Sequence, residues 1–208
     1  MNGRHSIQLS NRPSTRTKRR CRFPLVVPFR RRDQLPIQLE NMHTMKQVSI
    51  LHLITELDTG GAQRALARLV DGLPREHFDC QVACLYNGNG AVARQIRALG
   101  IPVTDLGMTA KWRGDALVGL FAALRRERPT ILHTWMIHAN LAGRVIGRLA
   151  GVPIIISSRR NVHIGGPLRE RLNRWTVHLS DRVIAVCELA RQVEIERAGV
   201  PPDHVLTI

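Results

Sequence analysis

Short aliphatic runs alternate with amphipathic segments from Met45 to the last residue of the chain. Runs such as 48–54 are apolar throughout, which is typical of strands in a parallel sheet covered on both faces. Between the runs, apolar side chains recur every three or four residues, as at Ala62, Leu66 and Leu69, and this period predicts helices. The expected strands are residues 48–54, 78–85, 101–106, 130–134, 152–157, 181–186 and 205–208, and the expected helices are 62–73, 92–99, 115–128, 139–150, 167–179 and 188–198.

This alternation predicts an α/β fold with a Rossmann-like, doubly wound, mainly parallel sheet. Residues 45–208 are enough to bury a proper core, so we expect one such domain there. In folds of this class, ligands bind beyond the carboxyl ends of the strands, near the point where the strand order reverses. The loops that follow the strands are therefore where functional residues are expected.

The first 44 residues have a different composition. They hold ten Lys and Arg against two acidic residues, a net charge of +8 out of +15 for the 208-residue chain. Prolines interrupt them and no helical or strand period survives, so residues 1–44 are expected to be a disordered basic extension. It suits a targeting segment, a nucleic-acid-binding tail or an artefact of a gene start placed too far upstream. We favour the last, because Met45 directly precedes the first strand.

Composition excludes several classes of protein. No apolar run approaches the ~20 residues that span a bilayer, and four scattered cysteines do not make a disulfide scaffold. The excess of positive charge favours an anionic partner such as nucleic acid, a lipid surface or a phosphorylated ligand. Aromatic residues are only 4% of the chain, which offers few base-stacking platforms, so nucleic acid ranks last.

Two glycines follow the first expected strand. Gly60 and Gly61 lead directly into a helix, whose free amides and dipole favour an anion such as phosphate. The pair matches neither the dinucleotide fingerprint nor a P-loop. Taken alone, it equally describes a plain strand-to-helix turn, which is the interpretation we favour.

Two histidines and a tryptophan follow the fourth strand. We expect His133 to pack within the sheet and His138, which lies beyond the strand, to face the ligand cleft. Trp135 between them is a candidate stacking surface for a sugar. Zinc is disfavoured, because no carboxylate or thiol follows at ligand spacing.

The loops after the fifth and sixth strands carry charge. Arg159 and Arg160 can clamp a phosphate or carboxylate, although a solvated basic loop explains them equally well. Glu188 can accept hydrogen bonds from ligand hydroxyls or simply sit at a helix N-terminus, where the dipole favours it. The helix 167–179 is basic and amphipathic; we expect its apolar side to pack on the sheet, with contact to an anionic membrane as the alternative.

The order of these motifs resembles the N-terminal, acceptor-side domain of a family-four retaining glycosyltransferase of the GT-B type. The resemblance covers residues 46–208, and its motifs are fairly specific together although each is weak alone. They are Ile50-Leu51-His52, Gly60-Gly61-Ala62-Gln63, Ile131 to Trp135, Ala139 to Gly143, Gly151-Val152-Pro153, Ser157 to Asn161 and Asp181 to Glu188.

The resemblance implies an enzyme that transfers a sugar from a nucleotide-sugar donor to a lipid-linked or polysaccharide acceptor, with no cofactor and no metal. It implies that Gly60 and Gly61 approach the donor phosphates and that His138 is catalytic. Trp135, Arg159, Arg160, Asn161 and Glu188 would then lie on the acceptor side. The expected location is the cytoplasm, at the inner face of the membrane if the basic surface contacts lipid.

The sequence departs from the family pattern at three places. Trp135 stands where many relatives have a histidine, and Cys187 stands where a serine is usual. The chain ends at Ile208, where relatives continue into a donor-binding domain that carries an E-x7-E signature; we regard the same spacing of Glu188 and Glu196 as a coincidence. We therefore expect an N-terminal half that is inactive alone. The alternative is a non-catalytic module that binds a phosphorylated ligand or a separate donor-domain chain.

Overall fold

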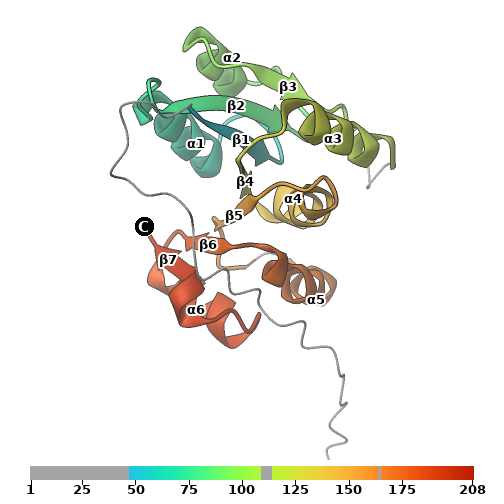
Figure 1. The fold of residues 1–208 in the computed structure, drawn as a ribbon. Helices are drawn as coiled ribbons and strands as arrows, with labels where there is room; N and C mark the ends of the chain where they lie inside the picture. Colours follow the sequence, from blue (N-terminus) through green and yellow to red (C-terminus); the bar gives the residue numbers. More distant parts are fainter. Residues whose placement is uncertain (1–46, 109–113, 164) are drawn as a thin grey trace, which may run out of the picture.

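The computed structural model describes residues 47–108, 114–163 and 165–208, and the expected basic extension at 1–44 lies outside these ranges. Strands and helices alternate from the first described residue to the last, as the sequence predicts (Figure 1). The strands are β1 Val48–Ile54, β2 Phe78–Cys84, β3 Val103–Asp105, β4 Ile131–Trp135, β5 Ile154–Arg159, β6 Arg182–Ala185 and β7 Val205–Thr207. The α-helices are α1 Gly61–Gly72, α2 Ala91–Ala98, α3 Gly114–Glu127, α4 Ile137–Leu149, α5 Pro167–Thr176 and α6 Glu188–Glu196.

The seven strands form one sheet in the order β3-β2-β1-β4-β5-β6-β7. Every neighbouring pair is parallel, which confirms and sharpens the expected mainly parallel sheet. The strand order reverses between β1 and β4. Successive strands from β1 to β3 are added on one side of this point, and those from β4 to β7 are added on the other. The carboxyl ends of β1 and β4 are thus the switch point at which such folds bind ligands.

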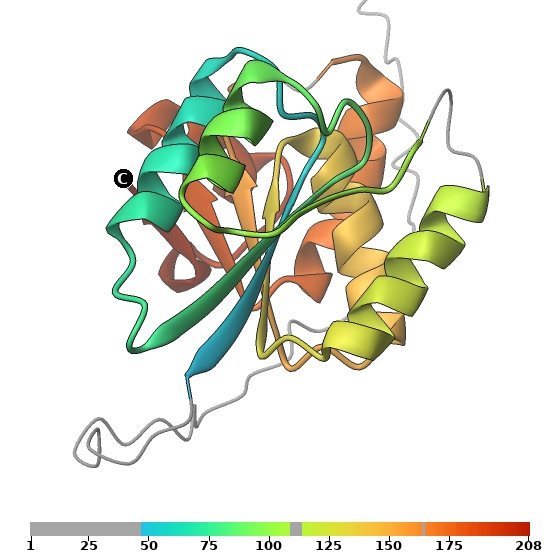
Figure 2. The same ribbon diagram turned by 90° about the horizontal axis from the view of Figure 1, so that it is seen from above.

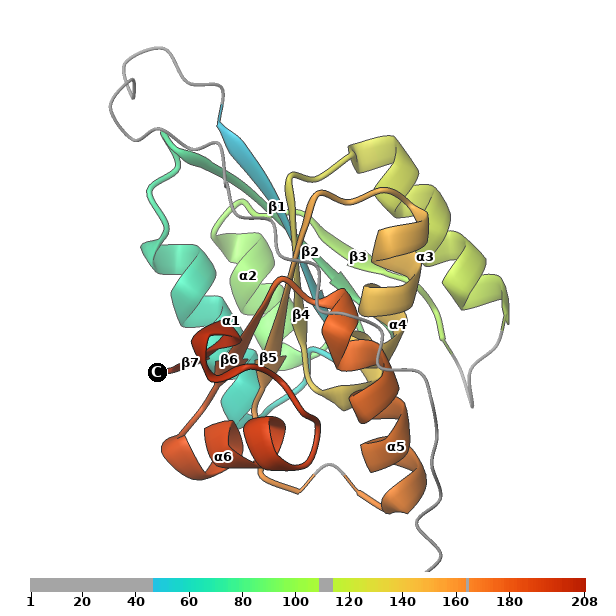
Figure 3. The same ribbon diagram turned by 60° about the horizontal axis from the view of Figure 1, so that its bottom comes forward.

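Helices cover both faces of the sheet (Figure 2). On one face α1 and α2 pack on an aliphatic cluster that includes Leu66, Val82 and Ile96. On the other face α3 and α4 pack on a cluster that includes Leu53, Leu124 and Leu132. The α5 helix lies next to α4, and α6 packs on the β6–β7 end of the sheet (Figure 3).

Helix α4 approaches the sheet unusually closely. A Cβ on Gly143 would collide with Thr134 and Leu53, and one on Gly147 would collide with Leu132 and Ile155. Small residues at these two positions therefore set the distance between α4 and the central strands. This close approach also brings the first turn of α4 against the end of β5.

One packing expectation is wrong. The apolar residues of α5 do not all face the protein, because Leu168 is 65% exposed and Trp175 is 64% exposed. The buried residue of this helix is Asn173, which meets a polar partner on α4. A polar interior contact thus replaces the apolar one that the helical period predicted, and Leu168 and Trp175 lie on the solvent side.

Candidate functional site

A pocket of about 250 Å³ lies beyond the carboxyl ends of β4 and β5. Its walls come from the first turn of α4, the loop after β5, and α5 and α6. Of the residues that the sequence singled out, the structure brings together His138, Arg159, Arg160 and Asn161. The remaining wall residues are Met136, Ile137, Asn140, Ser158, His163, Gly165, Arg169, Asn173 and Glu194.

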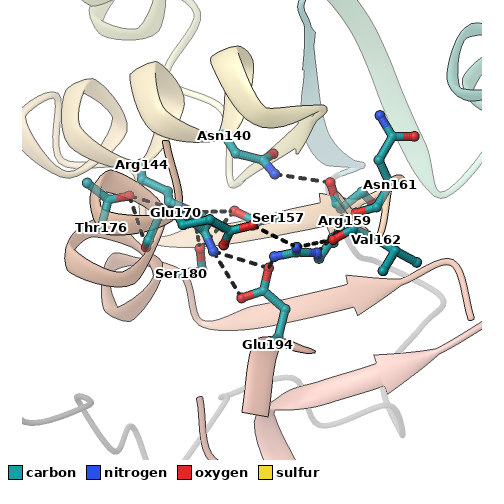
Figure 4. Close-up of polar contacts among 12 residues, drawn as sticks. Asn140, Arg144, Ser157, Arg159, Asn161, Val162, Glu170, Thr176, Ser180 and Glu194 are labelled. Atoms are coloured by element: carbon teal, nitrogen blue, oxygen red, sulfur yellow. Dashed lines mark hydrogen bonds and ion pairs between the residues drawn. The ribbon is translucent and has the colours of Figure 1, made fainter. Parts of the chain in front are cut away.

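An ion pair between Arg159 and Glu194 lies beneath this pocket (Figure 4). Arg159 Nη1 donates to Glu194 Oε1 at 2.6 Å, and the two side chains are 3% and 2% exposed. The rest of the Arg159 guanidinium holds the loop after β5, because Nε donates to the carbonyl of Asn161 and Nη2 to that of Val162. Arg159 therefore positions this loop through internal partners.

A second buried arginine extends the network toward α4. Arg144 Nε donates to the hydroxyls of Ser157 and Ser180, and Nη1 donates to Asn173 Oδ1 at 2.8 Å. Asn173 Nδ2 in turn donates to both carboxylate oxygens of Glu194. Burial lowers the pKa of Arg144 to about 10, so it stays charged at neutral pH. Side chains from α4, β5, α5 and α6 are thereby joined beneath one pocket.

Arg160 lies above this network, on the ring of Trp135. Its guanidinium carbon is 5.6 Å from the ring centroid, a cation–π distance. Burial lowers the pKa of this guanidinium. Trp135 itself is only 3% exposed, so in this structure its ring supports Arg160 and does not offer an open stacking surface to a sugar.

His138 stands on the pocket wall in the first turn of α4. Burial lowers the pKa of its imidazole, and the positive charge of Arg169 lowers it further. A histidine with a pKa below its ordinary value is neutral at pH 7 and can both donate and accept a hydrogen bond. The cleft position expected for His138 agrees with this placement.

Met136 links the pocket to the glycine loop. Its backbone has φ 70° and ψ 160°, a region that is populated almost only by glycine. Gln63, in the first turn of α1, lies with its Nε2 4.0 Å from Met136 Sδ. The strained residue therefore stands between the pocket and the helix that begins after Gly60, at the switch point of the sheet.

The glycine loop and Glu188 lie outside the pocket walls. A Cβ on Gly60 would collide with the side chain of Gln63, whereas a Cβ on Gly61 would point into open space. Glu188 is more than half exposed; it pairs with Arg191 and accepts a hydrogen bond from Thr207. The structure thus gives Glu188 partners within its own neighbourhood, and Glu188 does not line the pocket that contains His138.

Two buried histidines lie below the pocket in the sheet. His133 packs inside as expected, with Nε2 2.8 Å from Ser158 Oγ. Its neighbour His52 is 1% exposed, and burial lowers the pKa of His52 to about 4. Within the part of the chain that the structure describes, neither ring nitrogen of His52 has a hydrogen-bond partner.

Sequence reasoning missed Asn140, Arg144, Asn173, Glu194 and Met136. The two charged residues of this set had a weak signal in the sequence. Arg144 and Glu194 occupy positions on the buried faces of α4 and α6, where a charge without a partner is costly. Which partners they have depends on how α4, α5 and α6 pack. The backbone conformation of Met136 has no sequence signal.

Two further findings concern the described ranges. No group of three or more His, Cys, Asp or Glu side chains there is placed to hold a metal ion. Among the helices of those same residues, none has both the length and the apolar character that a membrane crossing requires.

Comparison with known proteins gives three kinds of similarity. A galactosyltransferase of Escherichia coli, named for UDP-Gal and α-D-GlcNAc-diphosphoundecaprenol, is 27% identical over 115 residues, which is 54% of this chain and 30% of that protein. Anabaena HepE in complex with UDP and glucose superimposes with a TM-score of 0.63 at 16% identity, over 78% of this chain and 44% of that one. The UDP-N-acetylglucosamine 2-epimerase of Rickettsia bellii superimposes with a TM-score of 0.57 at 12% identity, over 78% and 44%.

The solved structures show the fold alone, since their sequences are only 16% and 12% identical to this chain. The matched part of this chain covers less than half the length of each of these relatives. The family comes from a different observation: the model of the glycosyl transferase 4-like domain matches residues 60–208, which include both the glycine loop and the whole pocket. With the predicted sheet, switch point and motif order in place, the chain belongs to the glycosyl transferase 4-like domain family.

Proposed function

We propose that this chain is the acceptor-side half of a GT-B glycosyltransferase that moves a hexosyl group from a nucleotide sugar to a lipid-linked or polysaccharide acceptor. The observation that carries the proposal is a cationic pocket with a neutral histidine beyond β4 and β5, next to the switch point of a glycosyl transferase 4-like domain. The E. coli relative, named as acting on a diphosphate-linked lipid, supports this acceptor class.

The residues then have distinct roles. The amides at the start of α1, beside Gly60 and Gly61, favour the negative charge of the donor phosphates. His138 contacts a hydroxyl of the reacting sugars as a neutral donor and acceptor. Arg160 faces the acceptor, whereas Arg159 acts through the loop that it holds. Cationic side chains and helix dipoles stabilise the leaving diphosphate.

We further propose that the donor-binding half of the site comes from outside these 208 residues, in a second domain or a second chain. The part of this chain that matches covers only 30% and 44% of these two relatives, which supports this. Alone, the 208-residue chain is then expected to transfer no sugar, because half of the cleft is missing.

Peripheral membrane contact completes the proposal. The exposed side of α5 carries Leu168 and Trp175 together with Arg171 and Arg174. Tryptophan and leucine insert at the headgroup boundary of a bilayer, and arginines are attracted to anionic lipid. Since α5 also forms part of the pocket wall, such contact would place the pocket beside a lipid-linked acceptor.

The site assignment is tested by kinetics of the complete enzyme. We expect His138→Ala and Arg160→Gln each to lower kcat/KM by about a hundredfold or more, as general acid–base and charge-assisted contacts do. Arg182→Gln, an exposed arginine at the opposite end of β6, is the matched control and should transfer normally. Unchanged kcat/KM in both site variants would refute the assignment.

A further inference from the structure

The sheet face on which α1 and α2 pack is covered over only part of its width. Side chains that pair across neighbouring strands share a face, and successive residues of a strand point to opposite faces. Trp135 lies in the hydrophobic cluster under α1 and α2, and its partner on β5 is Ser158, so Ser158 is on that face. Among the described residues, this cluster takes members from β1 to β4 and none from β5, β6 or β7. Figure 1 shows α1 and α2 beside β1, β2 and β3, at one end of the sheet.

Aliphatic side chains occupy the remaining part of this face. Ser158 pairs with Ile184, which in turn pairs with Leu206. Leu206 is 54% exposed, and Ile208, two residues further along, is 71% exposed. We call five residues the uncovered sheet face: Ile154, Ile156, Ile184, Leu206 and Ile208. Within the described ranges, none of the five belongs to a hydrophobic cluster under a helix.

The opposite face of these strands is packed in the ordinary way. Val183, Ala185 and Val205 lie in one buried cluster with Ala190 of α6. A parallel sheet is normally covered on both faces, and its strands are aliphatic throughout for that reason. A contiguous aliphatic patch left on one face therefore marks a surface that another segment covers.

The N-terminal extension contains an apolar run that suits this surface. Residues 23–29 read Phe-Pro-Leu-Val-Val-Pro-Phe, and an arginine stands on either side of them. Pro24 and Pro28 lack the N–H that a central strand donates and would also break a helix, so the run favours an extended segment that packs through its side chains. Extended, it spans about 23 Å, whereas β5 to β7 are only two spacings of ~4.8 Å across. The run is therefore long enough to cross the uncovered sheet face.

The connection to the domain is also long enough. In the sheet order, β7 is four strands away from β1, which begins just after Gln47. Four strand spacings of ~4.8 Å amount to about 19 Å. Residues 30–46 join the apolar run to Gln47, and when extended they span up to about 56 Å. The run can thus reach the whole of the uncovered sheet face from the start of β1.

We propose that residues 23–29 lie across the uncovered sheet face and cover Ile184, Leu206 and Ile208. The arginines on either side of the run then lie beyond the aliphatic patch, where water solvates them. This gives the extension a structural role, in place of the upstream gene start that the position of Met45 favours. The proposal does not depend on sugar transfer, because it concerns how this domain completes its own core.

Photo-crosslinking in the full 208-residue chain tests where the run lies. A p-benzoylphenylalanine residue in place of Phe29 keeps an aromatic ring and reacts with neighbouring C–H bonds. We expect crosslinks within one molecule, to peptides that contain Ile184 or Leu206. The same probe in place of Leu9, an apolar residue of the extension outside the run, is the control and should give no crosslink to these peptides.

Hydrogen exchange gives a second, independent measurement on the same chain. Val26→Asp places a charge in the run, and an unpaired charge is costly to bury, so the variant should leave the sheet face uncovered. We expect amide exchange in β6 and β7 to become about tenfold faster, as local opening becomes easier. Ile37→Asp, in the extension but outside the run, should leave this exchange unchanged. Circular dichroism confirms that both variants are folded.

Four results would overturn the proposal. Crosslinks that join two molecules would make a second copy the occupant of the face. Crosslinks from Phe29 to other parts of the molecule, or none at all, would place the run elsewhere. Equal exchange in Val26→Asp and Ile37→Asp would show that the run does not protect β6 and β7. Protection that occurs only when a separate donor-binding chain accompanies this one would assign the face to that chain.

Discussion

Arg159 and Glu194 form an ion pair 2.6 Å long in which both side chains are almost fully buried. They come from the end of β5 and from α6, thirty-five residues apart in the chain. The sequence around each residue does not predict that the two side chains form an ion pair. Their pairing fixes the loop that carries Arg160, and so determines the shape of the pocket.

Removing the carboxylate should destabilise the protein strongly. In Glu194→Gln, Arg159 and Arg144 lose their shared counter-charge while they remain buried, and breaking a buried pair in this way costs about 3–5 kcal/mol. Urea unfolding of the 208-residue chain measures the change. Glu196→Gln, two residues further along the same helix and exposed, should cost less than about 0.5 kcal/mol. Equal stability of the two variants would mean that the network contributes little.

The backbone conformation of Met136 should lower the stability of the folded protein, and two substitutions at this residue measure by how much. Both Met136→Gly and Met136→Ala remove the side chain, so the difference between them isolates the backbone conformation. Because φ 70° with ψ 160° is accessible to glycine, we expect the glycine variant to be the more stable of the two by about 1–3 kcal/mol. Chemical denaturation of the pair measures this. A more stable alanine variant would argue against strain at this residue.

Stability should fall on acidification because of His52. Its pKa is about 4 in the folded protein against an ordinary 6.5, so the unfolded chain binds the proton more tightly. Stability is then complete above pH 6.5 and is lost as the pH falls toward 4, by an amount on the order of 3 kcal/mol. His52→Phe should reduce this pH dependence, and the remainder is expected from His133, whose pKa burial also lowers. His77→Phe, which removes an exposed histidine, should leave it in place.

The exposed side of α5 should bind anionic vesicles. Burying Leu168 or Trp175 in a bilayer is worth about 1.5–3 kcal/mol per side chain. Leu168→Ser and Trp175→Ser should therefore each weaken sedimentation with phosphatidylglycerol vesicles about tenfold or more. Leu189→Ser, which removes a 56% exposed leucine from α6, is the matched control. Equal binding to phosphatidylcholine vesicles would contradict the role of the arginines.

The sequence predicts the fold well because strand and helix periods are local signals. The seven strands and six helices all occur where aliphatic runs and helical periods place them, with boundaries that shift by a few residues. At β3 the strand starts after Pro102 and not at Ile101, since proline cannot donate to a sheet. Pro153 similarly precedes the start of β5.

The candidate site is predicted less completely, because its chemistry depends on contacts between distant elements. The positions of His138 and Arg160 follow from the rule that ligands bind at strand ends. The internal role of Arg159 does not follow, because it needs Glu194 from another helix. The exposure of Leu168 and Trp175 also differs from the expected inward packing, since a helical period cannot show that Asn173 is the side chain that packs inward.

The central claim is that this domain belongs to an enzyme that moves a sugar onto an acceptor. It is tested most directly by incubating labelled UDP-hexoses and a diphosphate-linked lipid hexose with two preparations: the 208-residue chain, and the gene product purified from its own cells with any chains that accompany it. The account predicts label in the lipid fraction with the native preparation and none with the 208-residue chain alone. Absence of label from every UDP-hexose in the native preparation would contradict the central claim. Transfer by the 208-residue chain alone would contradict the separate proposal that the donor-binding half lies outside these residues.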